Sequence, residues 1–370
     1  MENKTKRTIV VSGINLRSGG PLTILRDCLA YLSEGELSKE YRIVALVHSR
    51  ALADYPNIEY IEFPKSITSW VYRLYYEYFY FQRLSKELKP YLWLSLHDVT
   101  PNVICPNQAV YMHNPSIVNK IKRSDWKFDK KYIAFALLYK FLYRINIRRN
   151  RFCIVQQNWF RDICADKFGI PKQQIIVARP FAQHLESVAR ATGEKGCRKF
   201  FFPSLPRPFK NFETVCAAAK ILERKGLTDI KVTITLDGSE NAYSKWIYSK
   251  YGDCGIIKFA GLLTKEEMKA TYAETDCLIF PSRLETWGLP ISEFIPYMKP
   301  MIIADEPYAH ETSEGAESVA YFPTNDAKTL AQIMEQAVTG DFSKFSKNAV
   351  AQLCPPYARN YRELFNTLLQ

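Results

Sequence analysis

The stretch from Asp276 to Phe294 constrains the fold of this chain more than any other part of the sequence. It opens with a short apolar run, Cys277 to Phe280, which ends at a Pro-Ser pair and is typical of a buried strand in a parallel sheet. A loop with Gly288 follows, and Pro290 then stands where a helix can begin, because its fixed φ suits a first turn. A strand, a glycine loop and a helix in this order predict an open α/β sheet, in which ligands bind beyond the carboxyl ends of the strands.

Two carboxylates bracket this loop, Glu285 on it and Glu293 eight positions later in the first turn of the expected helix. A helix N-terminus offers free N–H groups and a partial positive charge, which suit a diphosphate. A carboxylate can accept hydrogen bonds from the vicinal hydroxyls of a ribose or a hexose. Together these groups suit a nucleotide sugar. Two glutamates at this spacing are also common on solvated loops and helices, so the spacing alone leaves both interpretations open.

The segment Glu285-Thr-Trp-Gly-Leu-Pro-Ile-Ser-Glu293 resembles the Glu-x7-Glu signature of retaining glycosyltransferases of family 4. The resemblance implies an α/β chain with the GT-B fold, in which two Rossmann-like parallel-sheet domains face a cleft. In that family the first Glu lies near the donor hexose, loop amides meet the hexose or phosphate, and the second Glu holds the ribose. The resemblance assigns these roles to Glu285, to Gly288 and Leu289, and to Glu293.

Two further strand ends in the first half of the chain match the same family. Gly19 and Gly20 precede a helix, and their spacing from Gly13 does not fit the dinucleotide motif G-x-G-x-x-G. The resemblance places these glycines beside the donor phosphate or the acceptor; a plain tight turn is the alternative. His113 ends a strand in Tyr-Met-His-Asn-Pro and is similar to the family histidine beside the donor hexose, whereas His97 is a weaker candidate.

The second half of the chain repeats the order of strand, loop and helix with basic residues on the loop. Lys210 and Arg207 can offer a point charge and a fork of donors to phosphate oxygens. Lys210 before Asn is typical of family 4, but the family arginine five residues earlier is Leu205 here, so Arg207 is at best a displaced substitute. Gly261 and Leu262 match the family position that borders the nucleotide base.

Length and composition suit two globular domains, since the chain has 370 residues of which 47% are hydrophobic. We expect an acceptor-side Rossmann-like domain over residues 1–182 and a linker over 183–197. We further expect a nucleotide-sugar-binding Rossmann-like domain over 198–354. The last segment, 355–370, is expected to be a C-terminal helix, helical from Tyr357 to Leu369, that crosses back to the first domain.

Several patterns favour a cytoplasmic protein. No run approaches the roughly 20 apolar residues that span a bilayer, and the N-terminus lacks the apolar region of a signal peptide. The nine cysteines include no CxxC pair, which fits a reducing compartment and argues against a zinc site.

The segment 118–151 is strongly basic, with eleven Lys or Arg residues against Asp125 and Asp129. From Tyr132 onward its apolar residues recur at helical spacing, and a basic amphipathic helix with aromatic residues is typical of a protein that lies on an anionic membrane surface. Nucleic acid is the competing partner, but no recognition motif accompanies the charge, so we expect none. An ordinary solvated face is the third interpretation. We therefore expect peripheral binding to the inner face of the plasma membrane.

These observations together predict a retaining hexosyltransferase that uses a UDP- or GDP-linked sugar. The expected acceptor is a hydroxyl of a glycan, lipid-linked, in the assembly of a surface polysaccharide such as O-antigen or capsule. His113, Glu285 and Lys210 are the expected catalytic residues, and no cofactor or metal is expected because the chain contains no Asp-x-Asp. Two alternatives stay open: a GT-B sugar-nucleotide epimerase, and a non-catalytic GT-B partner protein, which the missing arginine at Leu205 would explain.

Overall fold

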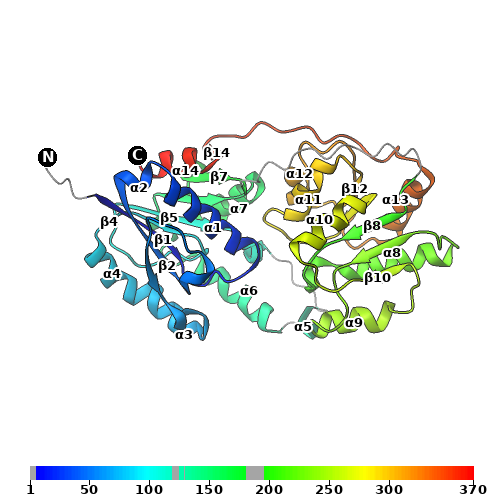
Figure 1. Ribbon diagram of the computed structural model, residues 1–370, viewed down its shortest axis with the longest axis horizontal. Helices are drawn as coiled ribbons and strands as arrows, with labels where there is room; N and C mark the ends of the chain where they lie inside the picture. The colour runs from blue at the N-terminus through cyan, green and yellow to red at the C-terminus, as the bar shows by residue number, and fades with distance from the viewer. Residues whose placement is uncertain (1–5, 119–124, 129, 181–195) are drawn as a thin grey trace. The chain divides into compact units, whose positions relative to one another are not determined.

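The computed structural model describes residues 6–118, 125–128, 130–180 and 196–370 (Figure 1). The chain divides into two compact units. Unit 1 comprises Met1–Ile117, Ala136–Phe181 and Leu353–Gln370, and unit 2 comprises Val118–Phe135 and Ala182–Gln352. Each unit is built on a single sheet of parallel strands with helices packed on it (Figure 1).

The sheet of unit 1 has eight strands in the order β14-β7-β6-β5-β4-β1-β2-β3, and every neighbouring pair is parallel. The strands are β1 (Arg7–Gly13), β2 (Tyr41–Val47), β3 (Glu59–Glu62), β4 (Pro90–Ser95), β5 (Asn107–Met112), β6 (Phe152–Val155), β7 (Ile175–Ala178) and β14 (Tyr357–Ala358). Along the chain, β2 and β3 are added on one side of β1, and β4 and the strands after it are added on the other side. The topological switch point, where ligands bind in open α/β sheets, therefore lies between β1 and β4.

Helices cover both faces of this sheet. They are α1 (Gly19–Glu34), α2 (Leu37–Glu40), α3 (Trp70–Tyr75), the π-helix η3 (Tyr76–Tyr80), α4 (Phe81–Leu88), α6 (Lys130–Leu142), α7 (Asn158–Phe168) and α14 (Tyr361–Leu368). Alternate strand residues point to opposite faces. Ile9 and Val11 accordingly join a buried cluster with α1 and α14, whereas Val10 joins a second cluster with α4.

The sheet of unit 2 has six strands in the order β10-β9-β8-β11-β12-β13, again all parallel. The strands are β8 (Lys199–Phe202), β9 (Lys231–Ile234), β10 (Ile257–Phe259), β11 (Cys277–Phe280), β12 (Met301–Ala304) and β13 (Val319–Phe322). The helices are α5 (Asp125–Phe128), α8 (Phe212–Arg224), α9 (Ala242–Tyr251), α10 (Lys265–Glu274), α11 (Leu289–Phe294), α12 (Pro307–Thr312) and α13 (Ala327–Thr339). Its switch point lies between β8 and β11.

The division of the chain differs from the expected one in the segment 118–135, which was expected in the first domain and belongs to unit 2. The reason is the short helix α5. Asp125 accepts a hydrogen bond of 3.0 Å from Arg283, and the Phe128 ring lies 5.5 Å from Tyr243 and 5.1 Å from Trp246.

The expected linker and the expected C-terminal helix flank the second domain in the sequence. Residues 183–195 of the expected linker lie outside the described residues, and Cys197 is buried in unit 2, where its N–H donates to Ala337. At the C-terminus, Tyr357 and Ala358 were expected to be helical but extend the sheet of unit 1 beside β7. The α14 helix that follows buries Phe365 in the core of unit 1.

No helix within the described ranges is long and apolar enough to cross a membrane.

Candidate active site

Two loops meet at the switch point of unit 2, one after β8 and one after β11. Because β8 and β11 are adjacent parallel strands, their following loops leave the same edge of the sheet. Backbone and side-chain contacts tie the loops together: the Arg283 N–H donates to the Phe209 carbonyl at 2.8 Å, and the Asn211 amide donates to the Pro281 carbonyl at 3.1 Å. This edge carries the predicted residues Lys210 and Glu285.

Lys210 and Glu285 form an ion pair at this edge. Their side chains are 17% and 14% exposed, so water screens the pair only in part. The Lys210 ammonium also lies 5.6 Å from the centre of the Phe209 ring and 5.9 Å from that of Phe280, where the ring faces attract a cation. The sequence analysis singled out both residues but did not predict that they contact each other. The arrangement holds a cation beside a carboxylate on neighbouring loops.

The glycine loop continues into α11. Gly288 has a φ of +84°, which a residue with a side chain rarely adopts, and a Cβ there would lie 3.4 Å from the side chains of Ile291 and Phe280. Leu289 is the first residue of α11 and Pro290 the second, so the helix begins one residue before the predicted position. Glu293 is the fifth residue rather than part of the first turn, and it accepts a 3.0 Å hydrogen bond from the Tyr272 hydroxyl.

The remaining predicted donor residues of unit 2 lie on the loop after β10 and on the loop after β8. Gly261 follows β10 with a φ of +68°, and a Cβ there would lie 3.2 Å from Asp237 after β9. Leu262 and Arg207 are exposed, and so is Leu205, which stands where the family has an arginine. Arg207 directly precedes the 3-10 helix η7 (Pro208–Lys210), so it lies on the same loop as Lys210.

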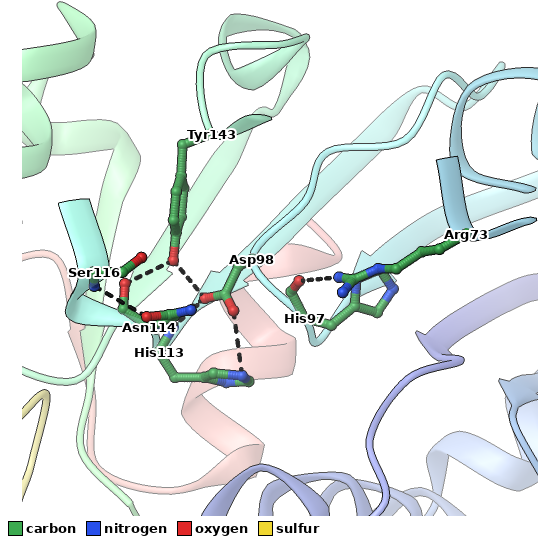
Figure 2. A network of polar contacts seen from close by, with 7 residues as sticks. All are labelled: Arg73, His97, Asp98, His113, Asn114, Ser116 and Tyr143. Carbon is green, nitrogen blue, oxygen red and sulfur yellow. Dashed lines mark hydrogen bonds and ion pairs between the residues drawn. The ribbon is translucent and has the colours of Figure 1, made fainter. Parts of the chain in front are cut away.

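The switch point of unit 1 brings together a different set of polar residues. The Ser12 hydroxyl at the end of β1 lies 3.1 Å from Nε2 of His97, which follows β4. His97 is completely buried, 3.3 Å from the carboxylate of Glu77, and Arg73 donates to its carbonyl oxygen at 3.2 Å (Figure 2). Gly19 and Gly20 form the first turn of α1, with a φ of +67° at Gly19. His97 is therefore a core residue at this switch point.

Asp98 organises the neighbouring strand end, which carries the predicted His113. Its Oδ1 atom accepts hydrogen bonds from the backbone N–H groups of His113 at 2.7 Å and Asn114 at 3.0 Å, and from the Tyr143 hydroxyl at 2.7 Å. Its Oδ2 atom lies 3.5 Å from Nε2 of His113. Figure 2 shows Asp98 between the Tyr143 hydroxyl and the His113 ring. Asp98 adopts this position with a φ of +69°, which aspartate and asparagine tolerate better than most residues.

Sequence reasoning missed most of this network. Asp98 was not among the predicted site residues, although a carboxylate directly after a strand is a signal for a residue at the ligand edge. Arg73 and Glu77 stand four residues apart in an otherwise aromatic stretch, which is a signal for an ion pair on one helix face. Tyr143 gave no signal, because a tyrosine on an amphipathic helix is as often a core residue.

Burial raises the pKa of the acid in this network and lowers the pKa of the base, and both shifts favour the uncharged form. Burial raises the pKa of Glu77 to about 8, with the Arg73 guanidinium acting against it. Burial, assisted by Arg73, holds the pKa of His97 well below its ordinary value of 6.5. At neutral pH the contact between Glu77 and His97 is therefore one between two uncharged groups.

The free energy of unfolding is expected to fall as the pH rises from 6.5 to 8. In that window native Glu77 keeps a proton that an unfolded glutamate, with a pKa near 4.5, has already lost, so rising pH favours unfolding. The slope for one proton is at most about 1.4 kcal/mol per pH unit. Below pH 6.5 uncharged His97 has the opposite effect, because the unfolded histidine takes up a proton, and the two slopes offset each other.

Thermal unfolding of the full chain at several pH values measures this effect. The Glu77→Gln variant should lose the decline in stability between pH 6.5 and 8, since glutamine does not titrate. Glu87→Gln removes an exposed carboxylate of α4 and should keep it. The same decline in Glu77→Gln as in the wild type would contradict the assignment of the buried proton.

Among the described residues no group of three or more His, Cys, Asp or Glu side chains is placed to hold a metal ion.

Most of unit 2 matches a known protein family, and the whole chain resembles solved structures. Residues 191–352 match the family model of the Glycosyl transferases group 1. No curated protein sequence matches this chain at a significant level.

Several solved structures resemble the whole chain. WaaG, a glycosyltransferase involved in lipopolysaccharide biosynthesis, has a TM-score of 0.62 at 11% identity over 90% of this chain and 92% of its own. The lipopolysaccharide outer core galactosyltransferase WaaB has a TM-score of 0.60 at 12% identity over 91% of each chain. Anabaena HepE, solved with UDP and glucose, has a TM-score of 0.60 at 13% identity over 91% of this chain and 92% of its own. At these identities the likeness shows the fold, and it confirms the predicted α/β GT-B fold.

Proposed function

We propose that this chain is a retaining glycosyltransferase that moves a hexose from a nucleotide diphosphate sugar to a hydroxyl of a glycan. The observation that carries the proposal is the pair of Lys210 and Glu285 at the switch point of unit 2, inside the segment that matches the family model. Open α/β sheets bind ligands at this point, and the pair offers one cation for phosphate and one carboxylate for sugar hydroxyls.

The other residues of unit 2 complete the donor site. Lys210 and the backbone N–H groups near Gly288 and Leu289 stabilise the charge that develops on the leaving diphosphate. Such stabilisation is most effective when the donors are already in position, and the contacts that hold Lys210 provide that. Glu293 accepts hydrogen bonds from the ribose, and Gly261 with Leu262 borders the base. With a lysine in this role the reaction needs no metal.

UDP is the nucleotide that we propose, because HepE was solved with UDP and with UDP-glucose. In unit 1 we assign His113 to sugar binding, as the family resemblance implies, and Asp98 fixes its backbone and ring. Gly19 and Gly20 open α1 at the switch point of the same sheet and border the donor phosphate or the acceptor.

The acceptor that we propose is a lipid-linked glycan of a surface polysaccharide, since WaaG and WaaB act in the synthesis of lipopolysaccharide. Apolar side chains of α6 and of the turn after it are exposed: Leu137, Leu138, Phe141 and Ile145. Basic residues lie among them, which supports peripheral binding to an anionic membrane surface. Lys120, Lys122 and Arg123 of the predicted basic segment lie outside the described residues.

A thermal-shift screen against UDP, GDP and their sugar conjugates, with and without magnesium, tests the donor site. A ligand at a hundredfold its Kd should raise the free energy of unfolding by about 2.7 kcal/mol. We expect UDP compounds to stabilise the wild type without magnesium, and Glu293→Ala to lose most of this shift. Glu274→Ala, which removes an exposed carboxylate of α10, is the control and should keep it. A wild type that no nucleotide stabilises would contradict the proposal.

A further inference from the structure

A basic pocket of about 430 Å³ lies in unit 1, away from the switch point. It is formed by the turn after α6, the short 3-10 helix η5 (Ile147–Arg149) and the C-terminal end of α7. Its lining residues are Arg144, Asn146, Ile147, Arg148, Arg149, Lys167 and Phe168. Four of the seven carry a positive charge and none is acidic. A pocket of this composition attracts an anion.

The cations of the basic pocket bond only to uncharged oxygens where their contacts are described. Arg148 donates from Nε to the Phe168 carbonyl at 3.1 Å, and Lys167 donates to the Ile117 carbonyl at 3.0 Å. Arg149 donates to the side-chain oxygen of Asn102. A guanidinium has five N–H donors and an ammonium three, so each keeps donors for a ligand. Phosphate oxygens suit this arrangement, because arginine binds them through two parallel hydrogen bonds.

One of the four cations also has a structural role. Arg148 lies at the C-terminal end of α7, where a positive charge meets the exposed carbonyls. Gly169 beside it has a φ of +62°, which favours glycine, and a Cβ there would displace the guanidinium, which lies within 2.7 Å. The contact of Arg148 with the end of α7 explains why an arginine stands at position 148. It does not explain Arg144, whose side chain is exposed. It also holds Arg148 in place before any ligand arrives.

Two exposed apolar residues are close in sequence to Arg144 of the basic pocket, and we call them its apolar rim. Ile145 stands next to Arg144, and Phe141 lies one helical turn before it; their side chains are 41% and 68% exposed. Large exposed apolar side chains beside clustered arginines are costly in water. They are favoured at a bilayer surface, where the rings and alkyl groups enter the boundary of the acyl chains and the arginines meet phosphates. The apolar rim therefore distinguishes a lipid headgroup from a free phosphate.

We infer that the basic pocket binds the phosphate of an anionic membrane lipid, with Phe141 and Ile145 inserted beside the headgroup. The inference rests on the proposed membrane association and names its contact site. None of the residues that line the pocket is assigned to the donor, so we assign the pocket to membrane binding and not to the transfer itself.

Sedimentation of the full chain with vesicles tests this inference. Vesicles of phosphatidylcholine containing phosphatidylglycerol are compared with pure phosphatidylcholine, and glycerol phosphate in solution serves as the free-phosphate probe. The test variant is Arg144→Gln with Lys167→Gln, which leaves the cap of α7 intact. The control is Lys39→Gln with Lys86→Gln, which removes two exposed charges of unit 1 on α2 and α4. Each basic residue at the surface contributes about fivefold in binding, so the test variant should bind about twentyfold more weakly.

The inference predicts binding of the wild type and the control to anionic vesicles, loss in the test variant, and no response to millimolar glycerol phosphate. Equal losses in the test variant and the control would overturn it, because the effect would then be general surface charge. Binding of glycerol phosphate without vesicle binding would also overturn it, in favour of a soluble phosphate ligand. Thermal shifts with UDP on the same proteins separate the two proposals, since the donor site is untouched by either variant.

Discussion

Replacing Lys210 by methionine is expected to lower kcat/KM for hexose transfer by about a hundredfold to a thousandfold, the range seen when one preorganised group is removed from a developing negative charge. Methionine keeps the length and apolar contacts of the lysine stem but removes the charge. The variant also leaves Glu285 without its cation on a loop where the carboxylate is only 14% exposed. Both changes make the leaving diphosphate harder to stabilise.

Steady-state kinetics of nucleotide release measures this effect. Lys220→Met is the matched control, because Lys220 forms an ion pair with Asp253 at 2.9 Å on α8, outside the loops after β8 and β11. It should stay within about twofold of the wild type, because neither partner of this pair is assigned to the donor and Asp253 is 70% exposed. Activity of Lys210→Met within tenfold of the wild type would contradict the role of Lys210.

Replacing Asp98 by alanine is expected to lower the free energy of unfolding by about 3 kcal/mol or more and to reduce transfer strongly. Two backbone N–H groups lose their acceptor, and a buried donor without a partner costs about 1 to 3 kcal/mol. The Tyr143 hydroxyl loses one of its two acceptors and keeps the Asn114 carbonyl at 2.9 Å. Alanine also tolerates the φ of +69° less well than aspartate, at a cost of about 1 kcal/mol. The strand end that carries His113 would then be free to move.

Asp98→Asn separates the two roles of this side chain. Asparagine tolerates the same backbone conformation and keeps one oxygen for the backbone N–H groups, so most of the stability should remain. Its amide nitrogen would replace the carboxylate oxygen that faces Nε2 of His113 at 3.5 Å. We therefore expect near-wild-type thermal unfolding with transfer reduced about tenfold to a hundredfold, which is at or below the lower end of the roughly hundredfold to ten-thousandfold range for a positioned acid–base group. An Asp98→Ala variant as stable and active as the wild type would contradict this account.

The sequence predicted the fold well because local signals and sheet topology agree. Apolar runs of four to seven residues, each ending in a polar or glycine loop, marked most of the parallel strands, for example Cys277–Phe280. Parallel strands place all such loops on one edge, so Lys210 and Glu285 were expected at a ligand site without knowledge of their contact. The short strand β14 was missed because its two residues have no periodicity of their own.

The network behind His113 could not be predicted in the same way. Asp98, Tyr143 and Arg73 are distant in sequence, and their contacts depend on how the helices pack on the sheet. No local pattern encodes that packing. The position of residues 125–128 was missed for a similar reason: their contacts with unit 2 include an ion pair and an aromatic cluster, both with residues distant in sequence.

Product analysis of the wild-type chain tests the central claim most directly. The full chain is incubated with UDP-hexoses and with lipid-linked oligosaccharides extracted from membranes, and the products are identified by mass spectrometry and NMR. The account predicts acceptor-dependent release of UDP and a new glycosidic bond with the anomeric configuration of the donor. Conversion of the sugar nucleotide to an isomer without acceptor would instead show an epimerase. Intact donor, together with undetectable nucleotide binding, would show a non-catalytic protein and contradict the account.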